Sequence, residues 1–386
     1  MVDSGEDLAA RIESMRSACD RDPVNPENWA ELGALHMEAG ENDRAREAFE
    51  RLKSLRPDAA TFGLIGDLAL ERQDPRGAIE AYEQAHRLDR TDASIAGALA
   101  EAYMEAGRTD DARRMLELAS KLAPEDGQYL HALAGLALER CDYADLLELG
   151  IRLREVDPED EVSPAYLEAE AMMGLGEVET AARMYRNIAE MEPDLMPVRL
   201  SLAQAYLVMD DLAAAERELV EASKIWPESA EIHGSLGRIY LLEEDSERAK
   251  DCFAESIRLG PPSPWIYSLL AGCHLDAGEM DRAREVAQQG LQRFPDHSAC
   301  SVILSKIEIE AGNPAAAAEH ANRAIAANPK DHHAHLSLAA AQIDLESDPQ
   351  TVLGTLDRAV SLVEDEEERE QVLRLRQHYL DVIGER

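Results

Sequence analysis

Residues 26–57 read PENWAELGALHMEAGENDRAREAFERLKSLRP, and the proline that ends this stretch belongs to a series with a nearly fixed period. The series continues at Pro124, Pro158, Pro193, Pro227, Pro261, Pro295 and Pro329. Successive members lie 34 or 35 residues apart, and Pro57 lies two repeats before Pro124. A period of this length indicates a stacked array of repeats. Such arrays bind through an extended surface instead of one catalytic cleft.

Each repeat is predicted to contain two helices, because the remaining prolines fall where helices can begin. A proline inside a helix removes a backbone hydrogen bond and costs about 3 kcal/mol, whereas the first helical position tolerates it. Six dipeptides pair an N-cap candidate with such a proline: Asn25-Pro26, Asp74-Pro75, Ser163-Pro164, Ser263-Pro264, Asn313-Pro314 and Asp348-Pro349. Three of them open the first helix of a repeat and three open the second.

The side chains of residues 26–57 resemble the tetratricopeptide repeat pattern. The matching residues are Trp29, Leu32, Gly33, Gly40, Ala45, Phe49 and Pro57. The resemblance implies an all-α, right-handed α-solenoid, a superhelix of stacked helix-turn-helix repeats with terminal capping helices. With Trp29 at position 4, residues 25–363 divide into repeats one to ten: 25–57, 58–90, 91–124, 125–158, 159–193, 194–227, 228–261, 262–295, 296–329 and 330–363. Residues 1–24 and 364–386 are expected to form the capping helices.

Two positions fill the interior of each repeat. Position 8 is small in every repeat, as at Gly33, which allows the two helices to approach closely. Position 24 carries a large side chain such as Phe49 in most repeats. Repeats four, eight and nine have only Gly150, Ala287 and Ala321 there, so looser packing is expected in them.

The charge of the chain restricts the kinds of partner. The net charge is −39, from 78 acidic and 39 basic residues, and only six of the basic residues are lysines. A nucleic-acid or anionic-membrane partner is disfavoured, because binding to phosphate groups needs a basic face. A solvated surface and a high-salt cytoplasm also explain the acidity, and these alternatives stay open.

The sequence favours a cytoplasmic protein with no direct membrane insertion. No stretch reaches 18 apolar residues, and the N-terminus has no basic segment followed by an apolar run, so neither a membrane span nor a secretory leader is expected. The five cysteines stand singly and form no Cys-x-x-Cys pair, which is typical of a reducing compartment.

The resemblance implies that positions 2, 5, 9, 12 and 13 of the first helices line a concave groove. In repeats one to four, acidic residues occupy position 13 and part of position 9. These residues, called the acidic stripe below, are Glu38, Asp67, Glu71, Glu101, Glu105 and Glu139. The stripe is expected to contact basic residues of a partner. The Lys and Asn set with which chaperone-binding members of this family hold an acidic carboxyl-terminal tail is missing, so that ligand class is disfavoured.

In repeats five to seven the acids give way to apolar residues at positions 12 and 13. An apolar floor is expected from Leu207, Val208, Leu241 and Leu242, with Tyr166, Arg238 and Trp265 as the neighbouring groove residues. Exposed apolar residues beside aromatic and Arg anchors are typical of a partner-binding site. Position 12 is aliphatic in all ten repeats, so packing within the fold explains part of the pattern.

No catalytic residue, cofactor or metal site is assigned. The chain has no Gly-rich phosphate loop, Gly-x-Ser-x-Gly elbow or His-Glu-x-x-His motif. His332, His333 and His335, with His297 one repeat earlier, are the strongest candidates for metal ligands. Only His332 and His335 have the spacing of a helical ligand pair, and no cysteine is placed to complete a site. Metal binding by this cluster is left open.

The sequence therefore predicts a non-catalytic scaffold that holds an extended or helical segment of a protein or peptide partner with basic and aliphatic residues. One alternative is a structural protein that self-associates, using Arg11, Arg16 and Arg21 of the mildly basic N-terminal helix. Another is a regulatory subunit of an enzyme or of a secretion or assembly complex.

Overall fold

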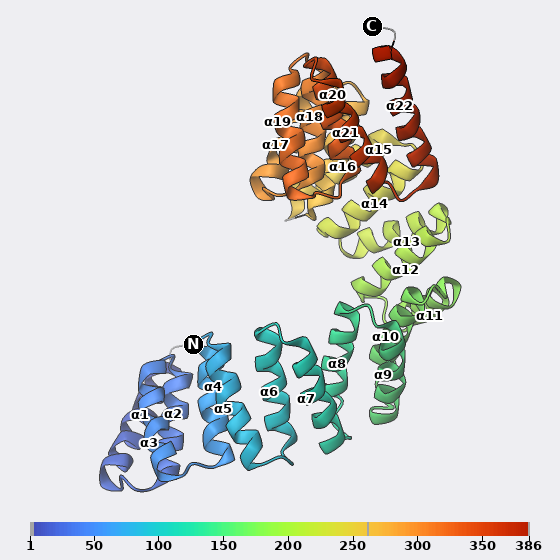
Figure 1. Ribbon diagram of the computed structural model, residues 1–386. Coiled ribbons are helices and arrows are strands. Elements are labelled where there is room, and N and C mark those ends of the chain that lie inside the picture. The colour runs from blue at the N-terminus through green and yellow to red at the C-terminus, as the bar shows by residue number, and fades with distance from the viewer. Residues whose placement is uncertain (1–3, 261, 385–386) are drawn as a thin grey trace. The chain divides into compact units, whose positions relative to one another are not determined.

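The computed structural model describes residues 4–260 and 262–384, and within them the backbone forms 22 α-helices and no strand (Figure 1). Consecutive helices pack as pairs joined by short turns, so the predicted all-α solenoid is confirmed. Pro261, one of the period prolines, lies outside the described residues. The chain divides into two compact units, Met1–Glu192 and Pro193–Arg386, called the N-terminal unit and the C-terminal unit.

The N-terminal unit begins with helix α1 (Ser4–Arg21), which is followed by five helix pairs. The pairs are α2 (Pro26–Glu38) with α3 (Asn42–Leu55), α4 (Ala59–Glu71) with α5 (Pro75–Leu88), α6 (Ala93–Glu105) with α7 (Thr109–Leu122), α8 (Gln128–Glu139) with α9 (Tyr143–Val156), and α10 (Val162–Gly174) with α11 (Val178–Met191). The even-numbered helix of each pair is thus the first helix of its repeat.

The C-terminal unit consists of five more pairs and a last helix, α22 (Glu366–Gly384). The pairs are α12 (Met196–Val208) with α13 (Leu212–Ile225), α14 (Ala230–Leu242) with α15 (Ser246–Leu259), α16 (Pro264–Asp276) with α17 (Met280–Arg293), α18 (Ser298–Glu310) with α19 (Pro314–Ala327), and α20 (His332–Asp344) with α21 (Pro349–Leu362). None of the described helices has the length and apolar character needed to cross a lipid bilayer.

Proline opens five helices at the positions that the sequence predicts, since α2, α5, α16, α19 and α21 each begin on one. The prediction for Ser163-Pro164 is wrong, because α10 begins earlier, at Val162. Asp160 replaces Ser163 as the capping residue. Its Oδ1 accepts hydrogen bonds from the backbone N–H groups of Val162 and Ser163 at 3.1 and 2.9 Å, and so satisfies amides that have no partner inside the helix.

The small residue at position 8 lies directly against the large residue at position 24 of the same repeat. A Cβ placed on Gly237 would lie 2.6 Å from the ring of Phe253, which is fully buried. The same pairing occurs between Gly33 and Phe49, where the distance would be 2.2 Å. Glycine is therefore required at these places by the ring that fills the space between the two helices.

Packing at Gly150 differs from the expectation for repeat four. The residue is buried, and a Cβ there would lie 2.9 Å from Cγ of Glu168 and 3.2 Å from the carbonyl oxygen of Pro164. Both neighbours belong to α10, the first helix of the next repeat. The missing side chain thus allows close approach of the following helix, and the expected loose packing is wrong at this residue.

The first and last helices cover the ends of the array. Ile12 of α1 packs in a cluster with the buried Leu32 of repeat one. Val372 of α22 is buried against Val363, which follows α21. Leu375, three residues further along α22, is 48% exposed and does not contribute to this contact. Each end helix therefore shields apolar surface that a terminal repeat would otherwise expose.

His297 caps helix α18. Its Nδ1 accepts a hydrogen bond from the backbone N–H of Cys300 at 3.3 Å, the role that Asn25 and Asp92 have in their repeats. An acceptor at Nδ1 must be unprotonated, and burial lowers the pKa of His297 below its ordinary value near 6.5. His297 is therefore a capping residue, and it lies in another repeat than the other three candidate metal-binding histidines.

This cap makes the stability of the C-terminal unit depend on pH. Because the folded pKa of His297 is depressed, its contribution is present above pH 6.5 and is lost as the pH falls through the folded pKa. Between pH 7.5 and pH 5, we expect the His297→Asn variant to lose less unfolding free energy than the wild type, because an asparagine amide caps a helix at any pH. The difference should be on the order of 1 kcal/mol. Urea unfolding at both pH values measures this difference. Equal losses in both proteins would contradict the capping role.

Candidate partner-binding surface

Several first helices of successive repeats contact one another within a unit. In the C-terminal unit α16 contacts α18, and α18 contacts α20, while α2 contacts α4 in the N-terminal unit. Among the described residues, second helices of successive repeats make fewer contacts with each other than these first helices do. In these repeats the first helices therefore lie closer to one another than the second helices do.

The acidic stripe lies on the first helices of the N-terminal unit, and all six of its residues are exposed. Glu38 lies 3.7 Å from the guanidinium of Arg11 in α1. Asp67 accepts a hydrogen bond from the hydroxyl of Tyr82 at 2.5 Å, and burial together with this bond raises the pKa of Tyr82. Within the described residues, no ion pair involves the remaining carboxylates, which are Glu71, Glu101, Glu105 and Glu139. Most of the stripe thus faces solvent without a cation.

Two apolar side chains are exposed at position 13 of repeats six and seven, as the sequence predicts. Val208 is 55% exposed and Leu242 is 56% exposed, and each is the last residue of its helix, α12 or α14. The equivalent position holds an exposed glutamate in repeats one to four. Since charged residues suit this position, the solvent-facing Val208 and Leu242 are not needed to fill the core.

A hydrogen bond between α12 and α14 places Val208 and Leu242 on one face. The guanidinium of Arg238 in α14 donates to Oε1 of Gln204 in α12. Val208 follows Gln204 by four residues and Leu242 follows Arg238 by four, and residues four apart lie on the same side of a helix. The two exposed side chains therefore occupy neighbouring turns of neighbouring helices. We call Val208 and Leu242 the apolar patch.

The other predicted floor and rim residues are less exposed. Leu207 and Leu241 are half-buried, so they contribute to packing as well as to the surface. Trp265 is 36% exposed, and its ring meets that of Phe253 edge-on at a centroid distance of 6.4 Å. Tyr166, in the N-terminal unit, is half-buried, with its ring 6.1 Å from that of Tyr185. These residues support the surface more than they project from it.

The N-terminal unit also contains a hollow of about 460 Å³ that sequence reasoning missed. Met184, Ile188 and Met191 of α11 provide apolar lining, and Arg154 of α9 pairs with Glu168 of α10 at 2.8 Å beside them. The apolar residues follow the spacing i, i+4, i+7, which ordinary packing also produces. Because three helices contribute, no local motif indicates the hollow.

The four histidines that the sequence offers as candidate metal ligands separate in the structure. His297 caps α18, and the buried His335 has its Nε2 3.2 Å from a backbone carbonyl oxygen. His332 and His333 remain together, and Glu368 of α22 joins them, with its Oε1 2.9 Å from Nε2 of His332. The i, i+3 pair of His332 and His335 is therefore the wrong grouping, and no sequence pattern pointed to Glu368.

Family models described as tetratricopeptide repeat match residues 26–58, 69–136, 172–239, 240–307 and 304–368. The chain belongs to the tetratricopeptide repeat family. The family predicted from Trp29 and its neighbours is thus confirmed, and tetratricopeptide repeat proteins generally mediate protein–protein interactions. A comparison with curated protein sequences found no significant match.

Solved tetratricopeptide repeat structures resemble this one in fold. A tetratricopeptide repeat protein from Parabacteroides merdae is 20% identical, with a TM-score of 0.50 over 64% of this chain and 97% of its own. Yeast Tom70 is 13% identical, with a TM-score of 0.48 over 93% of this chain and 96% of its own. The Cut9–Hcn1 hetero-tetramer of the APC/C gives 14% identity and a TM-score of 0.48, over 98% of this chain and 88% of the matched chain. At these identities the likeness concerns the fold alone.

Proposed function

We propose that this tetratricopeptide repeat protein is a non-catalytic scaffold that binds a segment of a partner protein along its first helices. The observation that carries the proposal is the apolar patch, in which Val208 and Leu242 are each more than half exposed on adjacent helices. Contiguous exposed apolar side chains with polar neighbours are typical of protein interaction sites. The partner segment would place aliphatic side chains on the patch, beside the guanidinium of Arg238.

In the N-terminal unit, the acidic stripe would bind basic residues of a partner. The contact of Glu38 with Arg11 supports this, because it shows an arginine of a neighbouring helix beside the stripe. Glu71, Glu105 and Glu139 repeat the same position in the next three repeats. A row of like charges attracts a cationic segment from a distance, and salt weakens this attraction.

The stripe predicts how partner binding depends on salt. We expect the triple substitution Glu71→Gln, Glu105→Gln and Glu139→Gln to weaken binding about tenfold at 50 mM salt, because each exposed ion pair contributes about 0.2–1 kcal/mol. At 500 mM salt the variant and the wild type should bind almost equally. The measurement is recovery of partners from native lysate on the immobilised full chain, followed by titration with the recovered partner.

A matched control removes the same number of charges from second helices. Glu50→Gln, Glu80→Gln and Glu148→Gln change exposed residues of α3, α5 and α9. This variant should keep the affinity and the salt dependence of the wild type. Equal weakening by both triple variants would mean that net charge, and not the stripe, attracts the partner.

A further inference from the structure

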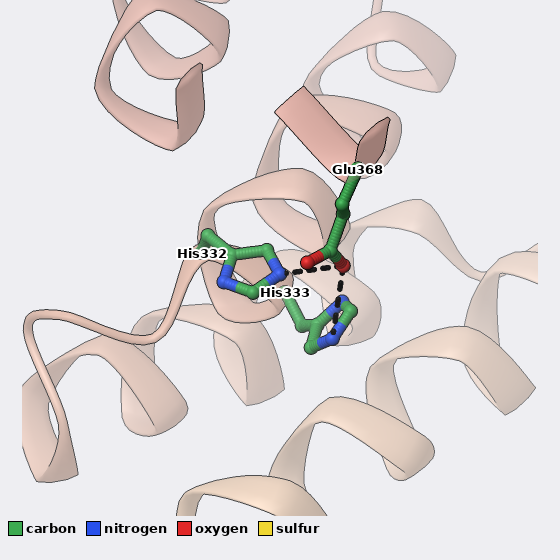
Figure 2. Close-up of side chains that lie close together, drawn as sticks. All are labelled: His332, His333 and Glu368. Atoms are coloured by element: carbon green, nitrogen blue, oxygen red, sulfur yellow. Dashed lines mark hydrogen bonds and ion pairs between the residues drawn. The ribbon is translucent and has the colours of Figure 1, made fainter. Parts of the chain in front are cut away.

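Two imidazole rings and one carboxylate converge near the C-terminal end of the array, as Figure 2 shows. Nε2 of His332 lies 2.9 Å from Oε1 of Glu368, and Nε2 of His333 lies 3.7 Å from the same oxygen. The two rings pack together with centroids 4.0 Å apart. One ligand atom from each of the three residues can be chosen so that all lie within 4.8 Å of one another.

The backbone on both sides of the cluster is held by carboxylate caps. Asp331 precedes α20, and its Oδ1 accepts hydrogen bonds from the backbone N–H of His333 at 3.0 Å and of the next residue at 3.3 Å. Asp365 precedes α22, and its Oδ1 accepts from the backbone N–H of Glu368 at 2.8 Å. The three ligand residues therefore project from helix starts that are already ordered.

The spacing suits a small divalent cation bound by nitrogen and oxygen. Zinc bonds to imidazole nitrogen and carboxylate oxygen are about 2.1 Å long, so two ligand atoms of a tetrahedral ion lie about 3.4 Å apart. The observed separations of 2.9 and 3.7 Å lie on either side of this value. Imidazole ligands favour zinc over magnesium, which prefers oxygen.

Access and charge also favour a cation. The side chains of His332, His333 and Glu368 are 20%, 54% and 36% exposed, which leaves the cluster open to an ion from solvent and to a water as fourth ligand. Helix starts carry partial positive charge, which opposes a cation. The carboxylates of Asp331 and Asp365 lie at these two starts and offset that charge.

We propose that His332, His333 and Glu368 form a zinc site that joins the last helix, α22, to the first helix of repeat ten. Glu368 is contributed by α22 and both histidines by α20, so one ion bonds to both elements at once. Binding to the docked form alone stabilises that form, by a free energy that rises with the logarithm of the zinc concentration above the dissociation constant. The docking of α22 on repeat ten, which covers the C-terminal end of the array, would therefore depend on zinc.

The test is calorimetric titration of the full chain with zinc chloride, after removal of metals with a chelator and in the presence of excess magnesium. The wild type should bind one zinc ion with high affinity. His332→Ala, His333→Ala and Glu368→Gln should each weaken this binding at least about tenfold. Zinc should also raise the thermal unfolding midpoint of the wild type, and Glu368→Gln should lose that rise.

Controls separate this site from other histidines and from misfolding. His378→Ala removes an exposed histidine elsewhere on α22 and should leave zinc binding unchanged. Glu368→Gln preserves the shape of the side chain, and its metal-free helical circular dichroism should equal that of the wild type. The proposal is overturned if the wild type binds no zinc, or if the three ligand variants bind it as the wild type does. Either result would leave His332 and Glu368 as an ordinary hydrogen-bonded pair.

Discussion

Replacement of Phe253 with alanine is expected to lower the unfolding free energy of the C-terminal unit by about 3–5 kcal/mol. Phe253 is fully buried, and its ring fills the space between α14 and α15, against Gly237. Removal of the ring leaves a cavity that the backbone closes only in part. Urea unfolding of the full chain, followed by helical circular dichroism, measures the loss. Asp251→Ala, an exposed change on the same helix, should stay within about 0.5 kcal/mol of the wild type.

The packing of Phe253 against Gly237 can also be tested by substituting Gly237. Gly237→Ala improves helix propensity by about 1 kcal/mol, but its Cβ would lie 2.6 Å from the Phe253 ring, and overpacking costs about 1–3 kcal/mol. Combining Gly237→Ala with Phe253→Leu gives the new methyl group room. The double variant should therefore be more stable than the sum of the two single changes predicts. Simple additivity would show that the two residues do not share this space.

Val208→Glu and Leu242→Glu should each weaken partner binding about 30-fold, which corresponds to about 2 kcal/mol. A charge in the apolar patch would have to lose its water when an aliphatic side chain of the partner packs on it. Folding should be almost unaffected, because both residues are more than half exposed and repeats one to four carry glutamate at the equivalent position. Titration with the recovered partner measures affinity, and thermal unfolding checks the fold.

Ile225→Glu is the matched control for these two substitutions. Ile225 is 41% exposed in the same unit, but it belongs to α13, a second helix. The change introduces the same charge away from the first-helix face, so partner affinity should not fall. If Val208→Glu or Leu242→Glu unfolded the C-terminal unit instead, these residues would be part of the core.

The repeat interior and the exposure of the apolar patch could be predicted because both follow from the period. Once Trp29 defines the register, Gly237 and Phe253 are expected to face each other. The glutamates at position 13 of the early repeats then identify Val208 and Leu242 as surface residues. Within a repeat of fixed length, the sequence separation of two residues corresponds to one defined arrangement in space.

Contacts outside this regular pattern could not be predicted in the same way. Glu368 meets His332 across 36 positions, in a helix that follows the last repeat and has no register to align. The close approach of α10 to Gly150 depends on the next repeat, whereas the pattern describes packing within one repeat. For His297 a signal did exist, since it aligns with the capping residues Asn25 and Asp92, but its residue type suggested metal binding.

Photocrosslinking from the first-helix face distinguishes partner binding along the first helices from binding elsewhere on the chain. A photoreactive phenylalanine derivative is introduced in the full chain at position 208, 242 or 225, and cells are irradiated before the adducts are identified by mass spectrometry. Positions 208 and 242 should label the same partner protein, whereas position 225 should not. Equal labelling of that partner from position 225, or adducts formed only between copies of this chain, would contradict a scaffold that binds its partner along the first helices.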